Sequence, residues 1–390
     1  FAYDDFGHVE AMVDPLGRIT TTVYDDRDNP ICTISPLGLR TTRIYDAAGR
    51  AYVTIDPLGA RTTLSLDAKG RTVSSTDPLG RTTGYVYSSE GLLAETSRPD
   101  GTSLESNYDS LSRLVATIDP LGQVTSYLYD DAGRRTVQID PLGGRSTTIY
   151  NAEGEAVVQI DPLGRRTTTT YDNDGRAIAV TNPLGLVTTT VYDAAGQAIA
   201  TVNPLGERTT TAYDAAGRVI SVTNPAGEMT QTAYDKAGRA IRTINPLGAI
   251  TTTVYNLAGE VIATINPLGF RSETTYDLNG RTSTTRDALG QTTVMFYDDA
   301  SRTIAVMNPM SYRTSTVYDV AGQAIAQIDP LGRRSSTVYD LMGRAVLTIN
   351  PLDERTTTVY DGAGRVIATI NPLGFAQSSV YDPLGRVIQT

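Results

Sequence analysis

The sequence predicts an all-β repeat protein, and three observations lead to this prediction. Tyrosine recurs every 21 residues from Tyr3 to Tyr381, and only Leu66 interrupts the row. Proline recurs once per unit and glycine about every 10 or 11 residues, a spacing that leaves no room for helices. The segments between these breaks are rich in Thr, Val and Ile, which favour strands. A strict period of this length is typical of repeat architectures.

Residues 360–380 show how one unit is built. Asp361-Gly362-Ala363-Gly364 reads as a four-residue turn, because Asp accepts hydrogen bonds at the first position and Gly tolerates a left-handed backbone at the last. Residues 365–370 form a strand rich in β-branched side chains. Asn371-Pro372-Leu373-Gly374 is a second turn, and residues 375–381 are the returning strand. Each unit is therefore strand, turn, strand, turn.

Simple alternation predicts which side chains share a face of the first strand. Val366, Ala368 and Ile370 are expected on one face, and Arg365, Ile367 and Thr369 on the other. Apolar residues on the opposite face, such as Ile220 and Val346, blur this alternation and leave the inward face undetermined.

The short turns permit two ways of stacking the units. In an antiparallel meander, neighbouring tyrosines lie about 9 to 10 Å apart, and in a parallel β-solenoid with 21-residue coils they lie about 4.8 Å apart. Turns with Asp first and Gly last suit tight hairpins, so the sequence favours the meander. In such a hairpin Tyr360 is expected opposite Arg365, as an aromatic–guanidinium pair.

Residues 1–390 are expected to form one continuous array of about 18 units, cut from a longer chain, because both ends fall inside the pattern. A few turns depart from the pattern in residue type but keep its length. This indicates substitutions that the turn tolerates and not the insertion of a functional site. These are Asp28-Asn29-Pro30, Tyr87-Ser88, Arg98-Pro99-Asp100-Gly101, Asp287-Ala288, Ala300-Ser301, Met310-Ser311 and Leu352-Asp353.

The composition excludes several classes of partner. The net charge of −10 and the pI near 4.7 argue against nucleic acid. No run of 18 apolar residues is present, so no membrane span is expected in this segment. The single cysteine, Cys32, excludes an intramolecular disulfide here.

Acidic residues recur at both turns of the unit, as Asp193 and Asp214 show for one and Asp119 and Asp140 for the other. Such ladders could gather Ca²⁺, which prefers oxygen ligands. Asn replaces Asp at the second turn, which favours a role in the turns over metal binding; examples are Asn182, Asn203, Asn245 and Asn266. No metal site is predicted.

Arginine recurs directly after the turn glycine, in a row that could bind acidic glycans; it includes Arg50, Arg71, Arg134, Arg176, Arg218, Arg239, Arg344 and Arg365. Gln197, Glu260 and Gln323 interrupt the row, and the chain is acidic. Pairing with tyrosines and turn carboxylates is therefore the favoured interpretation. His8, the only histidine, occupies the same position and is expected to be an ordinary strand residue.

No catalytic constellation is recognisable. Serines are scattered without a histidine base nearby, namely Ser146, Ser315, Ser335 and Ser336. Every unit resembles the next, and an active site repeated in each unit is implausible. The threonine rows could present hydroxyls to a glycan, but threonine also suits a half-solvated sheet face. The prediction is a protein that is no enzyme, with no catalytic, cofactor-binding or metal-binding residues and no cofactor.

The repeating pattern resembles that of the YD-repeat or RHS-repeat family. Each unit consists of Tyr-Asp-x-x-Gly-Arg, an apolar strand, Asp/Asn-Pro-x-Gly and a Thr-rich strand that leads to the next Tyr-Asp. The resemblance extends from Tyr3 to Arg386. It implies a long antiparallel β-strip that curls into a spiral, hollow tube or shell, as in bacterial toxin complexes, polymorphic toxins, teneurins and large bacterial surface proteins. A plug domain and a C-terminal toxin are not recognisable in this segment. Asp382-Pro383-Leu384-Gly385-Arg386 is similar to the family's self-cleaving region but is expected to be a plain turn.

The uniform frame favours a structural protein, an extended β-tube or filament in a bacterial extracellular or cell-surface assembly. One alternative is the wall of a toxin-encapsulating shell, and a second is a glycan-binding surface adhesin. The expected partners are further repeats or other copies of the chain, with an encapsulated polypeptide or a surface glycan as alternatives.

Overall fold

The computed structural model describes residues 1–390 as strands and turns, without a helix. This confirms the all-β prediction. Accordingly, the chain offers no helix of the length and apolarity needed to cross a membrane.

Each full unit contributes one six-residue and one five-residue strand. The six-residue strands, most of which end in the repeat tyrosine, are β3 (Ile19–Tyr24), β5 (Arg40–Tyr45), β7 (Arg61–Leu66), β9 (Thr82–Tyr87), β11 (Ser103–Tyr108), β13 (Val124–Tyr129), β15 (Arg145–Tyr150), β17 (Arg166–Tyr171), β19 (Val187–Tyr192), β21 (Arg208–Tyr213), β23 (Met229–Tyr234), β25 (Ile250–Tyr255), β27 (Arg271–Tyr276), β29 (Thr292–Tyr297), β31 (Arg313–Tyr318), β33 (Arg334–Tyr339) and β35 (Arg355–Tyr360). The five-residue strands are β2 (Val9–Val13), β4 (Pro30–Ile34), β6 (Ala51–Ile55), β8 (Thr72–Thr76), β10 (Leu93–Ser97), β12 (Leu114–Ile118), β14 (Arg135–Ile139), β16 (Ala156–Ile160), β18 (Ala177–Thr181), β20 (Ala198–Val202), β22 (Val219–Thr223), β24 (Ala240–Ile244), β26 (Val261–Ile265), β28 (Thr282–Arg286), β30 (Thr303–Met307), β32 (Ala324–Ile328), β34 (Ala345–Ile349) and β36 (Val366–Ile370). Four short strands lie at the ends: β1 (Ala2–Tyr3), β37 (Ala376–Ser378), β38 (Val380–Tyr381) and β39 (Val387–Gln389).

The strands form an antiparallel meander. Each strand from β1 to β37 pairs with its neighbours in sequence, giving one open 37-stranded sheet, as the pairings of β20 with β19 and β21 illustrate. The final hairpin, β38–β39, forms a separate two-stranded sheet, and Ser379 N donates to Ile367 O at 2.9 Å beside it. The meander is confirmed, and the solenoid alternative is wrong.

Both turns of the unit have the same geometry. In the turn after Tyr213, Gly217 N donates to Asp214 O at 3.0 Å, and Asp214 Oδ1 accepts from the backbone N–H groups of Ala216 and Arg218. In the preceding proline turn, Asn203 Oδ1 accepts from Leu205 and Glu207 in the same way. The amide and carboxylate oxygens are interchangeable in this role, which explains why Asp and Asn both serve.

The last turn position has a left-handed backbone even where glycine is replaced. Its φ is +76° at Gly217, +66° at Ser301, +64° at Ser311 and +61° at Asp353. The irregular turns therefore keep the turn geometry and accept a backbone conformation that costs a residue with a Cβ about 1 kcal/mol. This agrees with the prediction that the turns tolerate these substitutions.

A β-bulge at the start of each five-residue strand corrects the predicted alternation. Tyr360 pairs with Val366, but Val359 pairs with Ala368, so Ile367 is an extra residue. Val366 and Ala368 thus lie on opposite faces, because two residues of the bulged strand oppose one on its partner. Ile220 and Val346 occupy the same extra position.

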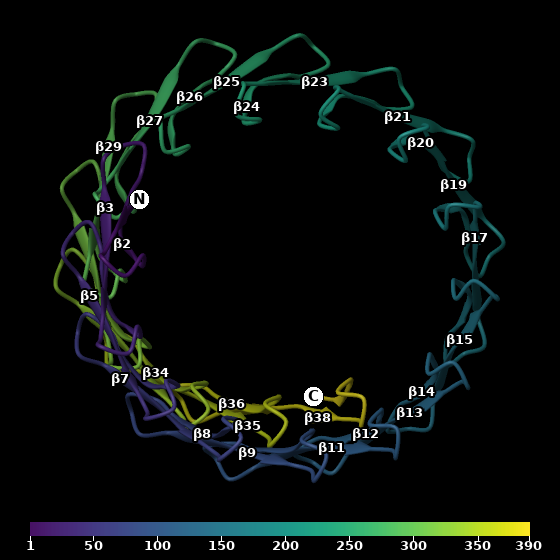
Figure 1. The fold of residues 1–390 in the computed structure, drawn as a ribbon, viewed down its shortest axis with the longest axis horizontal. Coiled ribbons are helices and arrows are strands. Elements are labelled where there is room, and N and C mark those ends of the chain that lie inside the picture. Colours follow the sequence, from purple (N-terminus) through teal and green to yellow (C-terminus); the bar gives the residue numbers. More distant parts are fainter.

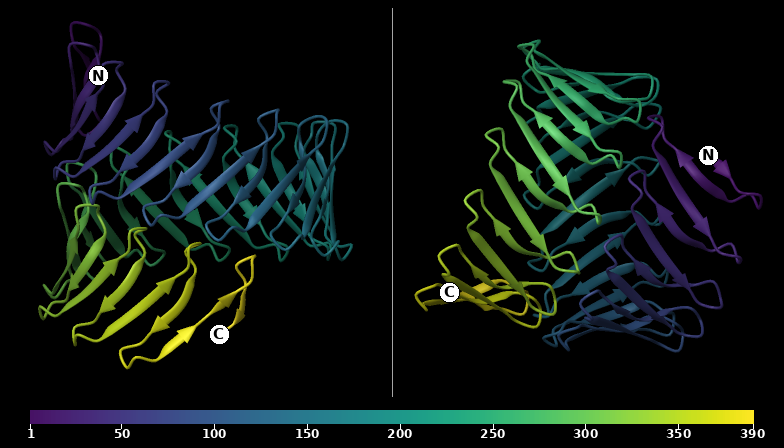
Figure 2. Two further views of the ribbon diagram at one scale, coloured as in Figure 1. Left: turned by 90° about the horizontal axis from the view of Figure 1, so that it is seen from below. Right: turned by 90° about the vertical axis from the view of Figure 1, so that its left-hand side faces the viewer.

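The sheet curls into an open spiral of more than one and a half turns (Figures 1 and 2). No part of the chain crosses the middle of the ring in Figure 1. The N-terminal strands lie beside the C-terminal strands, and the turns that touch are 242 residues apart. One coil therefore holds about 23 strands, which at about 4.8 Å per strand gives a circumference on the order of 110 Å.

The buried core is formed by side chains from a single position of the repeat. Only eight residues are buried, and all lie at the third residue of a five-residue strand: Cys32, Val53, Val137, Val158, Ala200, Ala263, Ala305 and Ala326. A single-layered sheet cannot form a thick core, so its stability depends on the backbone ladder and on contacts at the two edges.

Candidate functional site: the turn edges and the seam between coils

The turns that follow the tyrosines form one edge of the strip, called here the Tyr-Asp edge. Arg218 illustrates its chemistry. Arg218 Nε donates to Asp214 Oδ2 at 2.8 Å, its guanidinium carbon lies 4.7 Å from the centre of the Tyr234 ring, and Nη1 donates to Asp235 O at 3.4 Å. The Tyr234 hydroxyl donates to Val219 O at 2.8 Å. This unit is thus joined to the next by one arginine and one tyrosine.

The predicted pairing of arginine with tyrosine and turn carboxylates is confirmed, but its partner is corrected. Arg365 does not stack on Tyr360 in its own hairpin; it stacks on Tyr381 of the next unit at 4.7 Å, while Arg344 covers Tyr360. The reason is that the turn brings Arg365 beside Asp361, with its Nε 2.6 Å from Oδ2, so the side chain points along the edge. The aromatic contacts therefore join units instead of closing hairpins.

The same arginines set the electrostatics of the turn carboxylates. Hydrogen bonds from the Arg218 guanidinium and then from its backbone N–H lower the pKa of Asp214 below its ordinary value of 3.8. The pKa of Asp46 is lowered for the same reasons by Arg50. The carboxylates of Asp214 and Asp46 are thus stabilised as anions and already paired.

Replacement of Asp by Asn in the turns is not free, which corrects the sequence interpretation. An arginine at the fifth turn position always follows Asp, as in Asp214 and Arg218, whereas a glutamate always follows Asn. In the second case the Asn Nδ2 donates to the carboxylate, as from Asn203 to Glu207 Oε2 at 2.7 Å. The five Asn–Glu turns end in Glu155, Glu207, Glu228, Glu260 and Glu354. Comparing the first and fifth turn positions across the repeats would have revealed this rule.

His8 takes the place of an arginine in the first turn. Its Nδ1 lies 2.9 Å from Asp4 Oδ2, and its ring stacks on Tyr24 with the centroids 4.8 Å apart. The histidine therefore makes the same two contacts as Arg218 does.

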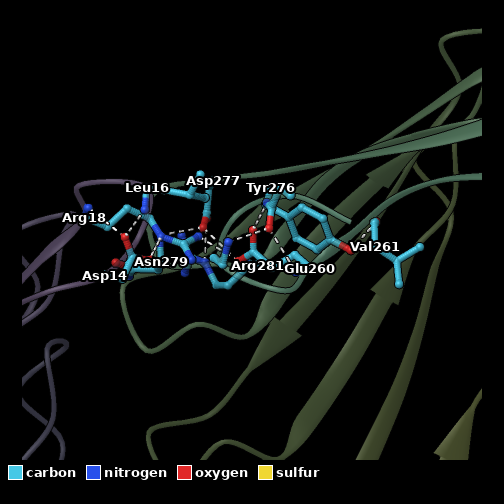
Figure 3. A network of polar contacts seen from close by, with 11 residues as sticks. Asp14, Leu16, Arg18, Glu260, Val261, Tyr276, Asp277, Asn279 and Arg281 are labelled. Atoms are coloured by element: carbon cyan, nitrogen blue, oxygen red, sulfur yellow. Dashed lines mark hydrogen bonds and ion pairs between the residues drawn. The ribbon is translucent and has the colours of Figure 1, made fainter. Parts of the chain in front are cut away.

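The proline turns form the opposite edge, called here the leucine edge, and where the spiral overlaps they contact the Tyr-Asp edge of the next coil. Figure 3 shows one such contact: Arg18 pairs with Asp14 of its own turn, and its Nη1 donates to Glu260 Oε1 at 2.7 Å. Beside it, Leu37 N donates to Asn279 Oδ1 at 3.1 Å. We call this line of contacts the seam.

The seam continues along the overlap through further hydrogen bonds from arginine side chains. Arg81 Nη1 donates to Gln323 Oε1 at 3.0 Å, and Arg98 Nη1 to Gly362 O at 3.4 Å. Where the lower turn has an arginine at its fifth position, the upper turn has Glu260 or Gln323 in place of the usual arginine. The interruptions of the arginine row are therefore explained by the neighbouring coil.

The charged pair of the seam is largely buried. The Arg18 and Glu260 side chains are 14% and 17% exposed, whereas Arg165, at the same position beyond the overlap, is 62% exposed. Burial and then the charge of Glu260 raise the pKa of Tyr276, which lies next to this pair.

The other candidate residues lie within the regular sheet. Ser146 pairs with Gln138 and Ser335 with Gln327 across neighbouring strands, while Ser315 and Ser336 both oppose isoleucines. Residues Asp382 to Arg386 form the ordinary turn, with Gly385 N donating to Asp382 O at 2.9 Å, as predicted. No group of three or more His, Cys, Asp or Glu side chains is arranged to hold a metal ion.

Comparison with known proteins agrees with this geometry. The family model described as RHS Repeat matches residues 67–103, 108–145, 150–190 and 192–229. These four matched segments are RHS repeats. The same 21-residue frame continues on both sides of the matched segments. No curated protein matches this chain.

Solved structures with the same fold include TcdB2-TccC3-TEV and TcdB2-TccC3 without its hypervariable C-terminal region, with TM-scores of 0.79 and sequence identities of 15% and 16%. A Photorhabdus luminescens Tc holotoxin pore carrying the TccC3 mutation D651A matches with a TM-score of 0.78 at 15% identity. Each match covers 95% of this chain but only 24% of the other chain. At this identity the likeness shows the fold alone.

Proposed function

We propose that this RHS-repeat chain is a non-enzymatic structural protein that forms part of the wall of a hollow, toxin-enclosing shell. The observation that carries the proposal is the seam. Side chains from both turn edges join two successive coils, as Arg18 with Glu260 and Leu37 with Asn279 show. A curled strip whose edges bind one another becomes a continuous wall around a space, which is a structural role in itself.

The chemistry of the side chains supports the same role. The arginines and acidic residues of the Tyr-Asp edge are paired within the chain, as Arg218 is with Asp214 and Tyr234. They join units, and the proposal assigns no catalytic residue. The fold shared with TcdB2-TccC3 and with a Tc holotoxin pore supports a shell in a toxin assembly. The proposed partner is an enclosed polypeptide, and the proposed location is outside the bacterial cell or at its surface.

An extended β-tube or filament is a second candidate, and one observation favours it. Both edges of the strip continue uncovered beyond the overlap, with leucines such as Leu205 and Leu247 exposed to solvent. A spiral with repeating edges can grow by identical steps. A glycan-binding surface stays a prediction from the sequence, for which exposed threonines such as Thr201 are the available groups.

Cryo-electron microscopy of the native secreted protein tests the proposal, combined with mass spectrometry of any polypeptide protected from protease. A shell predicts closed particles with walls of stacked strands and internal density, and a protected polypeptide that becomes accessible only on unfolding. Open, empty tubes of constant width would instead establish the filament. Flat strips without an enclosed space would contradict both.

A further inference from the structure

The sequence contains a single Asn-Gly pair, Asn279-Gly280, and this pair lies in the seam. It occupies the third and fourth positions of the turn that follows Tyr276, where many other units have Ala-Gly, as at Ala216 and Gly217. Most other asparagines precede proline, which has no N–H, and the rest precede a residue with a Cβ. Glycine lacks a Cβ, so its backbone nitrogen can approach the preceding side chain closely. Asn279 is therefore the asparagine most open to attack by its own main chain.

This attack leads to deamidation through a cyclic imide, with water as the only co-reactant. The Gly280 nitrogen forms a bond to Asn279 Cγ, and the bond between Cγ and the side-chain nitrogen breaks. The proton of the Gly280 N–H leaves with that side-chain nitrogen as ammonia. Water then adds to one of the two ring carbonyls and opens the ring. One opening gives aspartate, and the other gives isoaspartate, in which the main chain runs through the former side chain.

The turn and the seam hold the two reacting groups in hydrogen bonds. Gly280 N donates to Asp277 O at 3.0 Å, as the last residue of each regular turn does to the first. Asn279 Oδ1 accepts from Leu37 N of the neighbouring coil at 3.1 Å. The attacking nitrogen is thus engaged within the turn, while the side-chain amide is held toward the other coil. The reaction therefore requires a local opening of the turn and of the seam.

The charged pair of the seam packs against the same turn. A Cβ placed on Gly280 would lie 2.9 Å from Glu260 Oε1 and 3.4 Å from Arg18 Nη1, so this pair covers the Gly280 backbone. Figure 3 shows Asn279 within this network. Asn279 is half-buried, whereas Ala216 at the same turn position is exposed. The seam therefore restricts both the movement of the turn and the access of water to it.

We propose that Asn279-Gly280 is a site of spontaneous deamidation that the closed seam protects, and that its isoaspartyl product opens the seam. The proposal goes beyond the proposed function, because it concerns the contact between two coils and not what the coils enclose. Opening of the seam and modification of Asn279 then promote one another, so the first opening is made permanent.

The two products are expected to act differently on the seam. Aspartate at position 279 keeps a side-chain oxygen that can accept from Leu37 N, and it leaves the main chain unchanged. Isoaspartate adds one atom to the main chain before Gly280, so the four-residue turn no longer places Gly280 N against Asp277 O. The same shift moves Arg281, whose Nε donates to Asp277 Oδ2 at 2.7 Å. Isoaspartate therefore breaks the turn that carries this seam contact.

The first experiment measures deamidation of the 390-residue chain at mildly alkaline pH by peptide mapping with mass spectrometry. The folded chain should lose the Asn279 amide about tenfold or more slowly than the chain unfolded in urea, because the turn and the seam must open first. Ala216→Asn creates the same Asn-Gly pair in the same turn where it is exposed. In that variant, position 216 should deamidate faster than Asn279 within one molecule, which separates protection by the seam from protection by the turn.

Seam variants in the Ala216→Asn background test the coupling. Arg18→Glu should speed deamidation at Asn279 but not at position 216, and adding Glu260→Arg should bring the rate back toward its original value. Arg165→Glu is the matched control, because Arg165 pairs only with Asp161 of its own turn. Equal rates in the folded and unfolded chain, or at the two positions of the folded chain, would overturn the proposal. So would a rate at Asn279 that Arg18→Glu leaves unchanged, or one that rises equally at position 216.

The second experiment measures hydrogen exchange at Leu37 in the isoaspartyl form, separated by its charge and elution after ageing, and in Asn279→Asp. Leu37 N–H should stay protected in Asn279→Asp and lose its protection in the isoaspartyl form. Protection that persists in the isoaspartyl form would contradict the opening of the seam by this product. The proposed function is tested by the shape and contents of native particles, so it stands or falls separately from this inference.

Discussion

Leu37 and Leu205 occupy the same position of the same turn, yet one is 40% exposed and the other 82%. Leu37 lies under the next coil, where its backbone N–H also donates to Asn279, and Leu205 has no coil beside it. The backbone of the turn does not explain the difference, because both are Pro-Leu-Gly turns with the same two backbone–backbone hydrogen bonds. The difference shows that the repeat determines the strip, while long-range contacts along the seam determine the spiral.

The largest loss of stability is expected when the covered leucines of the seam are replaced by charged residues. Replacing Leu37, Leu58 and Leu79 together by lysine removes apolar contacts worth on the order of 1 kcal/mol each, or about 3 kcal/mol in total. The matched set, Leu205, Leu247 and Leu268 to lysine, should change stability by less than about 0.5 kcal/mol in the monomer. Thermal unfolding at dilute concentration measures both; equal losses would show that the coils do not stack.

A smaller difference is expected from the charged residues of the seam. Arg18→Glu places a carboxylate against both Asp14 and Glu260, whereas Arg165→Glu places one against Asp161 alone. Arg18→Glu should lower the melting temperature by about 3 °C more than Arg165→Glu, because like charges then meet in a half-buried site. Adding Glu260→Arg should recover most of that difference. No recovery would show that the two side chains do not meet.

Two glycines allow a finer comparison. Gly206 and Gly280 both have a positive φ, so replacing either by alanine should lower the free energy of unfolding by about 1 kcal/mol. A Cβ at Gly206 meets nothing within 4 Å, but one at Gly280 lies 2.9 Å from Glu260 Oε1 and 3.4 Å from Arg18 Nη1. Gly280→Ala should therefore be more destabilising by about 0.5 kcal/mol in denaturant unfolding. The reverse order would contradict the seam geometry.

The smallest difference between covered and uncovered turns is expected on acidification. Hydrogen bonds from Arg218 lower the pKa of Asp214, and hydrogen bonds from Arg365 lower that of Asp361 against the opposing effect of burial. A lowered folded-state pKa gives stability that is present above the ordinary value of 3.8 and lost as the pH falls through the folded value. Hydrogen exchange should show constant protection from pH 7 to about pH 5 and then a similar loss in both turns below about pH 4. Loss confined to one turn would contradict this.

Local chemistry made much of the fold predictable. The spacing of tyrosine, proline and glycine predicts the strands and turns, and the preference of Asp and Gly for the turn ends predicts the meander. The bulges were missed, although Ile220 and Val346 on the unexpected face marked them. An apolar residue out of alternation at the same place in many units indicates an extra residue in the strand.

The seam could not be predicted, because it depends on the number of strands in one coil. That number follows from small changes of twist and bend summed over about 23 strands, and no single unit encodes it. One trace was present in the sequence: Glu260 and Gln323 stand where arginine is expected, and their partners Arg18 and Arg81 lie one coil earlier. Without the spiral, Glu260 and Gln323 could be interpreted only as exceptions to the arginine row.

Disulfide trapping across the seam tests whether turns 242 residues apart in the sequence are neighbours in the fold. The pair Leu37→Cys with Asn279→Cys is introduced with Cys32→Ala, since alanine already occupies that repeat position at Ala200. The comparison pair, Leu37→Cys with Ala300→Cys, is shifted by one unit. We expect rapid cross-linking within one chain for the first pair and little for the second. Equal cross-linking of both pairs, or of neither, would contradict the spiral described here.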